Sequence, residues 1–322
     1  MESITDVLTN GLKSIKNNKI LFVPPIILMA ILMVIAFGII ALSFSPTFLQ
    51  SLGNIWITFF AYLCLFILIF TISVFINTGQ IGMAKEAAST GKTNMSHFMS
   101  YGKRFFGRVF AANIILILIQ AIALIFWTPA VYFLYKYDIL YNFTDAYYSL
   151  INSNIPSFAT SLGNIFSSFS IFSISISIII GAILSFIYIV VLSVLFFFVK
   201  YNIVVDDISA IASFKKSVSL LKAKTSQVIL FIVFLFIVLF TISMIFNFIV
   251  YMILTVLSLV LLFLMVLSPT LAVIGYILYM ILSIIFNIIY STLLPTLSVV
   301  WVTRFYMAIT EKQLYVIEKI TN

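Results

Sequence analysis

The chain has 322 residues, of which 64% are hydrophobic and 8% are charged, and its formal net charge is +8. A soluble protein of this length needs several times more charge to cover its surface, so the composition excludes an ordinary soluble globular protein. Apolar runs of more than 20 residues recur, and each is long enough to cross the roughly 30 Å of membrane hydrocarbon as a helix. We therefore expect an all-α, polytopic integral membrane protein.

The basic residues are concentrated in four segments. Residues 1–19, 78–108, 200–226 and 303–322 hold 3, 5, 5 and 3 Lys and Arg, and Lys136 is the one exception. This bias predicts six crossings with both termini in the cytoplasm of a cell-membrane protein. Because the cations lie next to the crossings, we expect anionic lipid headgroups as partners and no nucleic acid.

The chain begins with an amphipathic segment, residues 1–19, that we call an elbow because it is expected to lie in the membrane interface before the first crossing. Ser3 and Asp6 predict a capping box at its start. Its expected apolar face consists of Ile4, Val7, Leu8, Leu12 and Ile15. Crossings at 20–44 and 55–77, joined by an outer loop at 45–54, complete a first repeat of about 1–78.

The second repeat, about 79–199, starts with the sequence G-Q-I-G-M-A-K-E-A-A as a cytoplasmic helical extension. An elbow at 94–109 follows, with a basic face that includes His97. Its expected apolar face consists of Met95, Phe98, Met99, Phe105, Phe106 and Val109. We predict crossings at 110–135 and 171–199, separated by the longest outer segment, 136–170.

The third repeat, about 200–302, starts with an elbow at 200–227 in which Asp206 and Asp207 are expected to begin the helix. Its expected apolar face consists of Ile208, Ile211, Phe214, Val218 and Leu221. Residues 228–302 carry no charge, and we predict crossings at 228–251 and 271–294, with 252–270 as an apolar outer hairpin or a half-buried segment. The tail, 303–322, is expected to form a cytoplasmic amphipathic helix. Its expected inward residues are Phe305, Ile309, Val316, Ile317 and Ile320. The whole chain is then one membrane domain of three pseudo-repeats.

Three short motifs carry a resemblance to a known group of proteins: G-x-x-G-M-A-K-E-A after the second crossing, F-K-K-S-V-S-L-L after V-V-D-D, and Pro295 followed by Tyr306. With them the chain resembles a loose group of six-helix bacterial and archaeal integral membrane proteins of unknown function, related to the membrane domain of some glycerophosphodiester phosphodiesterases. The phosphodiesterase catalytic domain has no counterpart in this sequence, so the resemblance implies a membrane domain without that activity.

Polar residues inside the crossings form two sets. Ser173, Ser177, Gly181 and Ser185 recur every fourth residue, and small residues at this spacing allow close packing against another helix. The second set has two readings, interhelical hydrogen bonds or one uncharged polar path. It consists of Asn113, Gln120, Asn247 and Asn287.

No Asp, Glu, Lys, Arg or His lies inside a predicted crossing. This argues against a proton-coupled transporter, a rotary or redox pump and an intramembrane aspartyl protease, which need such groups. His97 is expected to be a solvated interfacial residue, and Cys64 lies in an apolar run. No metal-binding or phosphate-binding motif is present, so we expect no cofactor, no metal and no enzymatic activity.

The composition and charge pattern favour a membrane scaffold or accessory subunit on the anionic cytoplasmic leaflet. A transporter or channel for a neutral or lipid-like solute, with a cavity between the repeats, is the alternative, and a lipid-modifying enzyme is a third class. A membrane-protein partner or a second copy of the chain stays open. The expected anionic-lipid contacts are Lys13, Lys16, Lys103, Arg104, Arg108, Lys215, Lys216 and Lys222.

Overall fold

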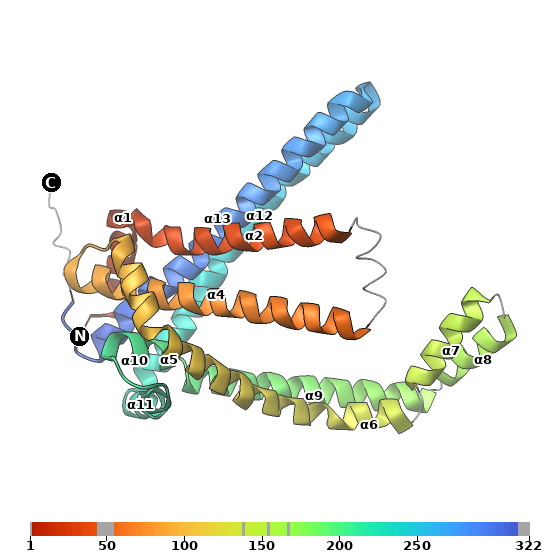
Figure 1. Ribbon diagram of the computed structural model, residues 1–322, viewed down its shortest axis with the longest axis horizontal. Helices are drawn as coiled ribbons and strands as arrows, with labels where there is room; N and C mark the ends of the chain where they lie inside the picture. Colours follow the sequence, from red (N-terminus) through yellow and green to blue (C-terminus); the bar gives the residue numbers. More distant parts are fainter. Residues whose placement is uncertain (1, 44–54, 137–138, 153–154, 166–167, 315–322) are drawn as a thin grey trace. The chain divides into compact units, whose positions relative to one another are not determined.

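The computed structural model describes all residues except 1, 44–54, 137–138, 153–154, 166–167 and 315–322 (Figure 1). The described residues form helices and no strands. Six helical stretches among them are long and apolar enough to cross a membrane, which confirms the all-α class and the predicted number of crossings. The chain divides into two compact units, Met1–Ala112 with Phe198–Asn322, and Asn113–Phe197.

The first unit contains both ends of the described chain and most of its charge. Its helices are α1 (Ile4–Asn17), η1 (Lys19–Phe22), α2 (Val23–Ser43), α4 (Ile55–Thr90), the first part of α5 (Met95–Ala121), α10 (Val199–Asp206), α11 (Ala210–Ala223), α12 (Thr225–Leu267) and α13 (Pro269–Ile309). Ser3 caps α1 in a capping box with Asp6, as predicted.

One end of this unit is closely packed, and we call it the base. It consists of residues 2–22 with α1 and η1, α4 from Val74, α5 to Ala112, α10 and α11 with the turn between them, α12 to Leu235, and α13 from Thr296. Its largest fully buried side chains include Leu21, Ile81, Phe105, Phe231, Trp301, Arg304 and Phe305. The rings of Phe231 and Phe305 stack with centroids 3.7 Å apart, so the start of α12 and the end of α13 are joined inside the base.

The remaining lengths of α2, α4, α12 and α13 project from the base, and we call them the stems (Figure 1). Their side chains are apolar and mostly exposed, such as Phe66 at 60% and Phe236 at 66%. This is the pattern expected of helices that face lipid, where apolar side chains need no protein partner.

The structure corrects the prediction for residues 228–302. The helix α12 does not end near Tyr251 but continues to Leu267, so that it has 43 residues in all, a length of about 64 Å. The predicted outer segment at 252–270 therefore belongs to the α12–α13 hairpin, whose turn is at the predicted break, Ser268-Pro269. Without a charge or a helix-breaking residue before Pro269, nothing in this stretch stops the helix.

The tail is also corrected. The helix α13 continues from the crossing through Arg304 to Ile309, and Phe305 and Ile309 are buried in the base. Residues 303–309 are thus the last turns of a crossing helix and not a separate interfacial helix. Residues 315–322, including Val316, Ile317 and Ile320, lie outside the described part.

The second unit contains the rest of α5, η2 (Ile122–Trp127), α6 (Thr128–Lys136), α7 (Ile139–Ile151), α8 (Ile155–Ile165) and α9 (Ser168–Leu195). The predicted third crossing is therefore interrupted by a 3-10 turn just before Pro129. The predicted outer segment contains two helices, α7 and α8, with Ser161 donating a hydrogen bond to Asp145.

Candidate functional site at the base

The V-V-D-D sequence turns the chain at the centre of the base. Residues Tyr201–Val205 of α10 are buried, and Asp207 ends this helix in the left-handed conformation with φ 57°. The next helix, α11, is capped by the Ser209 hydroxyl, which accepts from the backbone N–H of Ala212. The prediction that Asp206 and Asp207 begin this helix is wrong, because they form the end of α10 and Ser209 takes the capping role.

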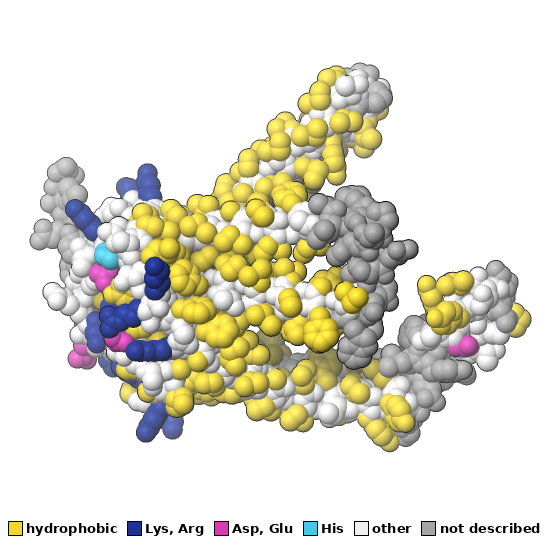
Figure 2. Space-filling view, viewed as in Figure 1, with side chains coloured by type: hydrophobic (Ala, Val, Ile, Leu, Met, Phe, Trp, Pro, Cys, Tyr) yellow, Lys and Arg dark blue, Asp and Glu magenta, His cyan; other side chains and the backbone are white. Residues whose placement is uncertain are grey.

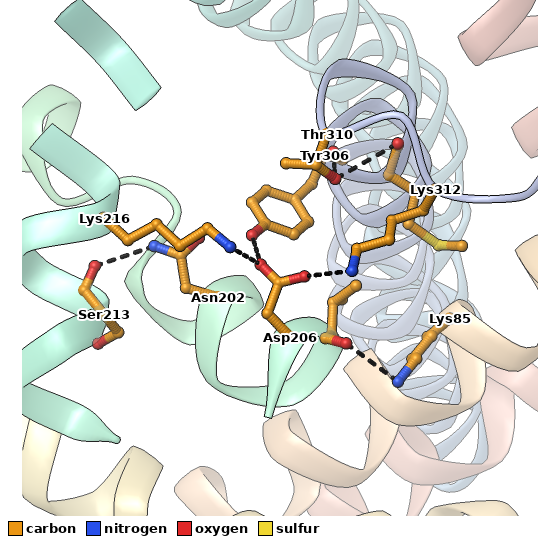
Figure 3. A network of polar contacts seen from close by, with 10 residues as sticks. Lys85, Asn202, Asp206, Ser213, Lys216, Tyr306, Thr310 and Lys312 are labelled. Atoms are coloured by element: carbon orange, nitrogen blue, oxygen red, sulfur yellow. Dashed lines mark hydrogen bonds and ion pairs between the residues drawn. The ribbon is translucent and has the colours of Figure 1, made fainter. Parts of the chain in front are cut away.

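Asp206 is the centre of a polar network that joins three parts of the chain (Figure 3). Its carboxylate is 4% exposed and lies 2.6 Å from the Lys216 ammonium of α11 and 3.1 Å from that of Lys312. The Tyr306 hydroxyl of α13 donates to the same carboxylate. A buried carboxylate loses its hydration, so it needs several such donors to stay ionised. Asp206 therefore fixes α10, α11 and the end of α13 to one another.

Two neighbouring contacts extend this network, and both involve backbone carbonyls (Figure 3). The Lys85 ammonium of α4 donates to the carbonyl of Val205 at 3.2 Å, where the last carbonyls of α10 carry partial negative charge. The side-chain amide of Asn202, fully buried, donates to the carbonyl of Ser213 at 2.9 Å. The Lys85 contact adds α4 to the group of helices fixed at this point.

Asp207 binds α5 from the exposed side. Arg104 and Arg108 both donate to its carboxylate, the latter at 2.6 Å. The hydrogen bond from Arg108, followed by the charge of Arg104, lowers the pKa of Asp207 below its ordinary value. Both guanidinium groups also lie over the Phe105 ring, at 5.1 and 5.7 Å from its centroid.

The N-terminal segment is held to α13 by a second ion pair. Arg304, 1% exposed, donates to both carboxylate oxygens of Glu2, at 2.9 and 2.5 Å. The Trp301 indole N–H donates to the carbonyl of Leu8 at 3.0 Å. A Cβ atom on Gly11 would lie 2.4 Å from the Trp301 ring, so only glycine allows α1 this close.

The predicted lipid-contact residues fall into two groups. Arg104, Arg108 and Lys216 are engaged with Asp207 or Asp206, and Lys13 is half-buried. The exposed lysines are Lys16, Lys103, Lys215 and Lys222. In Figure 2 the Lys and Arg side chains of this unit gather at the base, whereas its stems are covered by hydrophobic side chains.

The elbows use their predicted apolar faces in two ways. Val7, Phe98, Phe105 and Leu221 are buried in the base. Others of the predicted inward residues point outward: Leu12 is 50% exposed, Met99 46% and Ile211 77%. The elbows are therefore parts of a packed protein core with a second, exposed apolar edge.

The small-residue set lies in the second unit. Ser177, Gly181 and Ser185 are buried and Ser173 is half-buried. The Ser185 hydroxyl donates to the carbonyl of Ala123 at 3.3 Å. A Cβ on Gly181 would lie 2.8 Å from the carbonyl oxygen of Phe126. Gly181 and Ser185 thus face the 3-10 turn η2.

The four amides of the proposed polar path are not brought together within either unit. Asn247 and Asn287 belong to the first unit, are exposed, and bond within their own helices to Ser243 and Ser291. Asn113 and Gln120 belong to the second unit and are half-buried. His97 lies 3.4 Å from the Thr93 hydroxyl.

Three carboxylates of the base lie in ion pairs. Within the described ranges no group of three or more His, Cys, Asp or Glu could hold a metal ion. The carboxylates of Glu2, Asp206 and Asp207 are each engaged by cations. What the base offers a partner is its exposed lysines, which can bind anions.

The closely packed base and the apolar stems define a multi-pass α-helical membrane protein. The chain belongs to the family described as a domain of unknown function, DUF7847, whose model matches residues 3–309. No curated protein and no solved structure matches the chain. The family match agrees with the expected group of unknown function, while the relation to glycerophosphodiester phosphodiesterases stays a prediction.

Proposed function

We propose that the protein is a non-enzymatic scaffold or accessory subunit of the cell membrane, whose base lies on the anionic cytoplasmic leaflet. Two features support this orientation. The segments around the base hold 16 of the 17 Lys and Arg residues, as expected for a cytoplasmic side. Ser3 and Ile309, near the two ends of the described chain, both belong to the base, so both termini are cytoplasmic in this proposal.

One repeated observation carries the proposal. In each elbow an exposed apolar residue precedes an exposed lysine by four positions: Leu12 and Lys16, Met99 and Lys103, Ile211 and Lys215. Residues four apart lie on the same face of a helix. The three elbows therefore present the same pair of side chains on the surface of the base.

Such a pair suits the boundary between hydrocarbon and headgroups. The apolar side chain enters the edge of the hydrocarbon, while the lysine extends its ammonium to the phosphates. Each lysine near an anionic surface contributes about 1 kcal/mol, and salt weakens this attraction. Three pairs on one base would fix its depth and its tilt in the leaflet.

Adjacent residues offer a matched test. Lys103→Gln with Lys215→Gln removes two exposed lysines that form no ion pair among the described residues. Arg104→Gln with Lys216→Gln removes one exposed and one half-buried cation, each paired with an aspartate. Both variants lose the same charge at neighbouring positions. Native mass spectrometry of the purified protein, with phosphatidylglycerol or phosphatidylcholine added, measures how much of each lipid is retained at low and high salt.

We expect the first variant to retain less phosphatidylglycerol at low salt, with phosphatidylcholine unchanged. The second variant should melt at a lower temperature in both lipids and keep the wild-type ratio of the two. An equal loss of phosphatidylglycerol in both variants would contradict the proposal, because the engaged cations would then be as available as the exposed ones.

Handling of a neutral or lipid-like solute is the second candidate function. The observation that favours it is an open groove of about 420 Å³ between α2 and α13. This function does not depend on the lysines of the base, so the two candidates can be tested separately.

A further inference from the structure

A groove of about 420 Å³ lies between α2 and α13, away from the base. Both helices are candidate membrane spans, and Figure 1 shows α13 running obliquely past α2. Met29, Leu32, Met33 and Ala36 line the groove from α2, and Ser283, Ile284 and Asn287 line it from α13.

In a crossing that begins at Val23, the groove lies near the middle of the hydrocarbon. Met33 is ten residues beyond Val23, the first residue of α2, which places it about 15 Å along the helix. That is about half of the roughly 30 Å hydrocarbon thickness. Among the described residues no charged side chain lines the groove, so an ionised headgroup would find no counterion there.

Asn287 gives the groove a specific chemical character. Its Oδ1 accepts a hydrogen bond from the Ser291 hydroxyl at 3.1 Å. Among the described residues its Nδ2 has no acceptor, although the side chain is exposed on the groove. An amide N–H without an acceptor is unfavourable in hydrocarbon, so a ligand with an uncharged oxygen acceptor would complete the site.

The size of the groove selects the occupant. A transmembrane helix about 10 Å wide and 30 Å long occupies roughly 2,400 Å³, which is far more than the groove can enclose. A volume near 420 Å³ is typical of sites for small apolar ligands. Two methionines add an adaptable lining that fits a flexible chain.

We propose that the α2–α13 groove binds a neutral lipid whose uncharged carbonyl oxygen accepts a hydrogen bond from Asn287. The carbonyls of a phospholipid stay close to its charged headgroup at the membrane surface. A lipid without a charged headgroup can place its carbonyl at the depth of Asn287. The proposal goes beyond the scaffold function and does not rest on it.

The test uses a photoreactive diacylglycerol in dioleoylphosphatidylcholine vesicles that contain the full chain. Crosslinked peptides are mapped by mass spectrometry, and a photoreactive phosphatidylcholine serves as the second probe. We expect diacylglycerol to label residues 29–36 and 283–287, with unlabelled dioleoylglycerol competing. Loss of one hydrogen bond in Asn287→Leu should reduce this labelling roughly two- to tenfold.

The matched control is Asn247→Leu, since Asn247 is an exposed amide on the same hairpin but its Nδ2 bonds to Ser243. This variant should label like the wild type. Met33→Trp should block the groove, and Ala36→Leu replaces it if the former does not fold. Equal labelling of Asn287→Leu and wild type would overturn the proposal.

Two further outcomes also count against the site. Equal labelling of the groove by the phosphatidylcholine probe would show bulk lipid only. A second surface near the hairpin turn, around Leu261, Met265 and Tyr276, has a similar volume of about 440 Å³. Diacylglycerol labelling of that surface as strong as that of the groove would also show bulk lipid only. The lysine variants of the base should leave groove labelling unchanged, so this proposal and the scaffold function can fail independently.

Discussion

The base and the stems of the first unit share three helices, α4, α12 and α13, but are held by different forces. In the base, hydrogen bonds and ion pairs connect residues far apart in sequence, as between Glu2 and Arg304 or between Gln80 and Thr296. In the stems, side-chain hydroxyls and amides mostly bond back to their own helix, as Thr241 does to Ile237.

The difference follows from the solvent around each region. Lipid is as apolar as the stems, so burial gives the stems little reason to associate. The base contains polar and charged groups that must find partners when they leave water, and those partners fix the helices in one arrangement. We therefore expect changes in the base to cost far more stability than equivalent changes in the stems.

The largest effect is expected from breaking the buried ion pair. Glu2→Gln leaves the Arg304 guanidinium, 1% exposed, without its carboxylate, and loss of one partner of a buried pair costs about 3–5 kcal/mol. The free energy of unfolding is measured by titration with a denaturing detergent. Glu311→Gln is the control, because that glutamate is 86% exposed and 3.7 Å from Lys224, and should cost less than about 1 kcal/mol. Equal losses of unfolding free energy in the two variants would show that the buried Glu2–Arg304 pair stabilises the base no more than an exposed pair does.

A smaller effect is expected from close helix packing in the base. A Cβ on Gly82 would lie 2.2 Å from Cγ of Tyr101, whose hydroxyl donates to Glu86 at 2.5 Å. Gly82→Ala should therefore destabilise by about 1–3 kcal/mol. Gly107→Ala in α5 is the matched control, since nothing lies within 4 Å of its Cβ position, and it should be neutral or slightly stabilising. A neutral Gly82→Ala would mean that α4 and α5 can separate without cost.

The sequence predicts the stems better than the base. Long apolar runs and the confinement of charge reveal six crossings because each signal is local and strong. The sequence does not predict the full length of α12, because a crossing is assigned only the length needed to span one bilayer. A helix longer than the hydrocarbon can be accommodated by tilting, and this cannot be read from residue order.

The base could be predicted only in part. Amphipathic periodicity identified the elbows and placed Phe98, Phe105 and Leu221 inward correctly. It could not separate residues buried against protein from those at the exposed edge, because both are apolar, and so Ile211 was misplaced. The partners of Asp206 come from residues 216, 306 and 312, and such distant pairings leave no signal in one sequence.

A stem hydrogen bond should matter much less than the base contacts. The hydroxyls of Ser243 in α12 and Tyr290 in α13 lie 2.8 Å apart. Interhelical hydrogen bonds in membranes contribute on average about 0.6 kcal/mol, so Tyr290→Phe should cost about that amount in the same titration. Tyr276→Phe, an exposed tyrosine near the hairpin turn, controls for loss of a hydroxyl and should be neutral. A loss comparable to that of Glu2→Gln would remove the contrast between the two regions.

The smallest effect is expected from pH, and it concerns the exposed ion pairs of Asp207. Hydrogen bonding by Arg108 and the charge of Arg104 lower its pKa below the ordinary value of 3.8. A carboxylate with a lowered folded pKa contributes stability that is fully present above its unfolded pKa and is lost as the pH falls through its folded pKa. The stability difference between wild type and Asp207→Asn should therefore be constant from about pH 8 to about pH 5 and shrink only below about pH 4. A stability difference that changes between about pH 8 and about pH 6 would contradict this prediction, because Arg104 and Arg108 of α5 would then not hold the Asp207 carboxylate ionised.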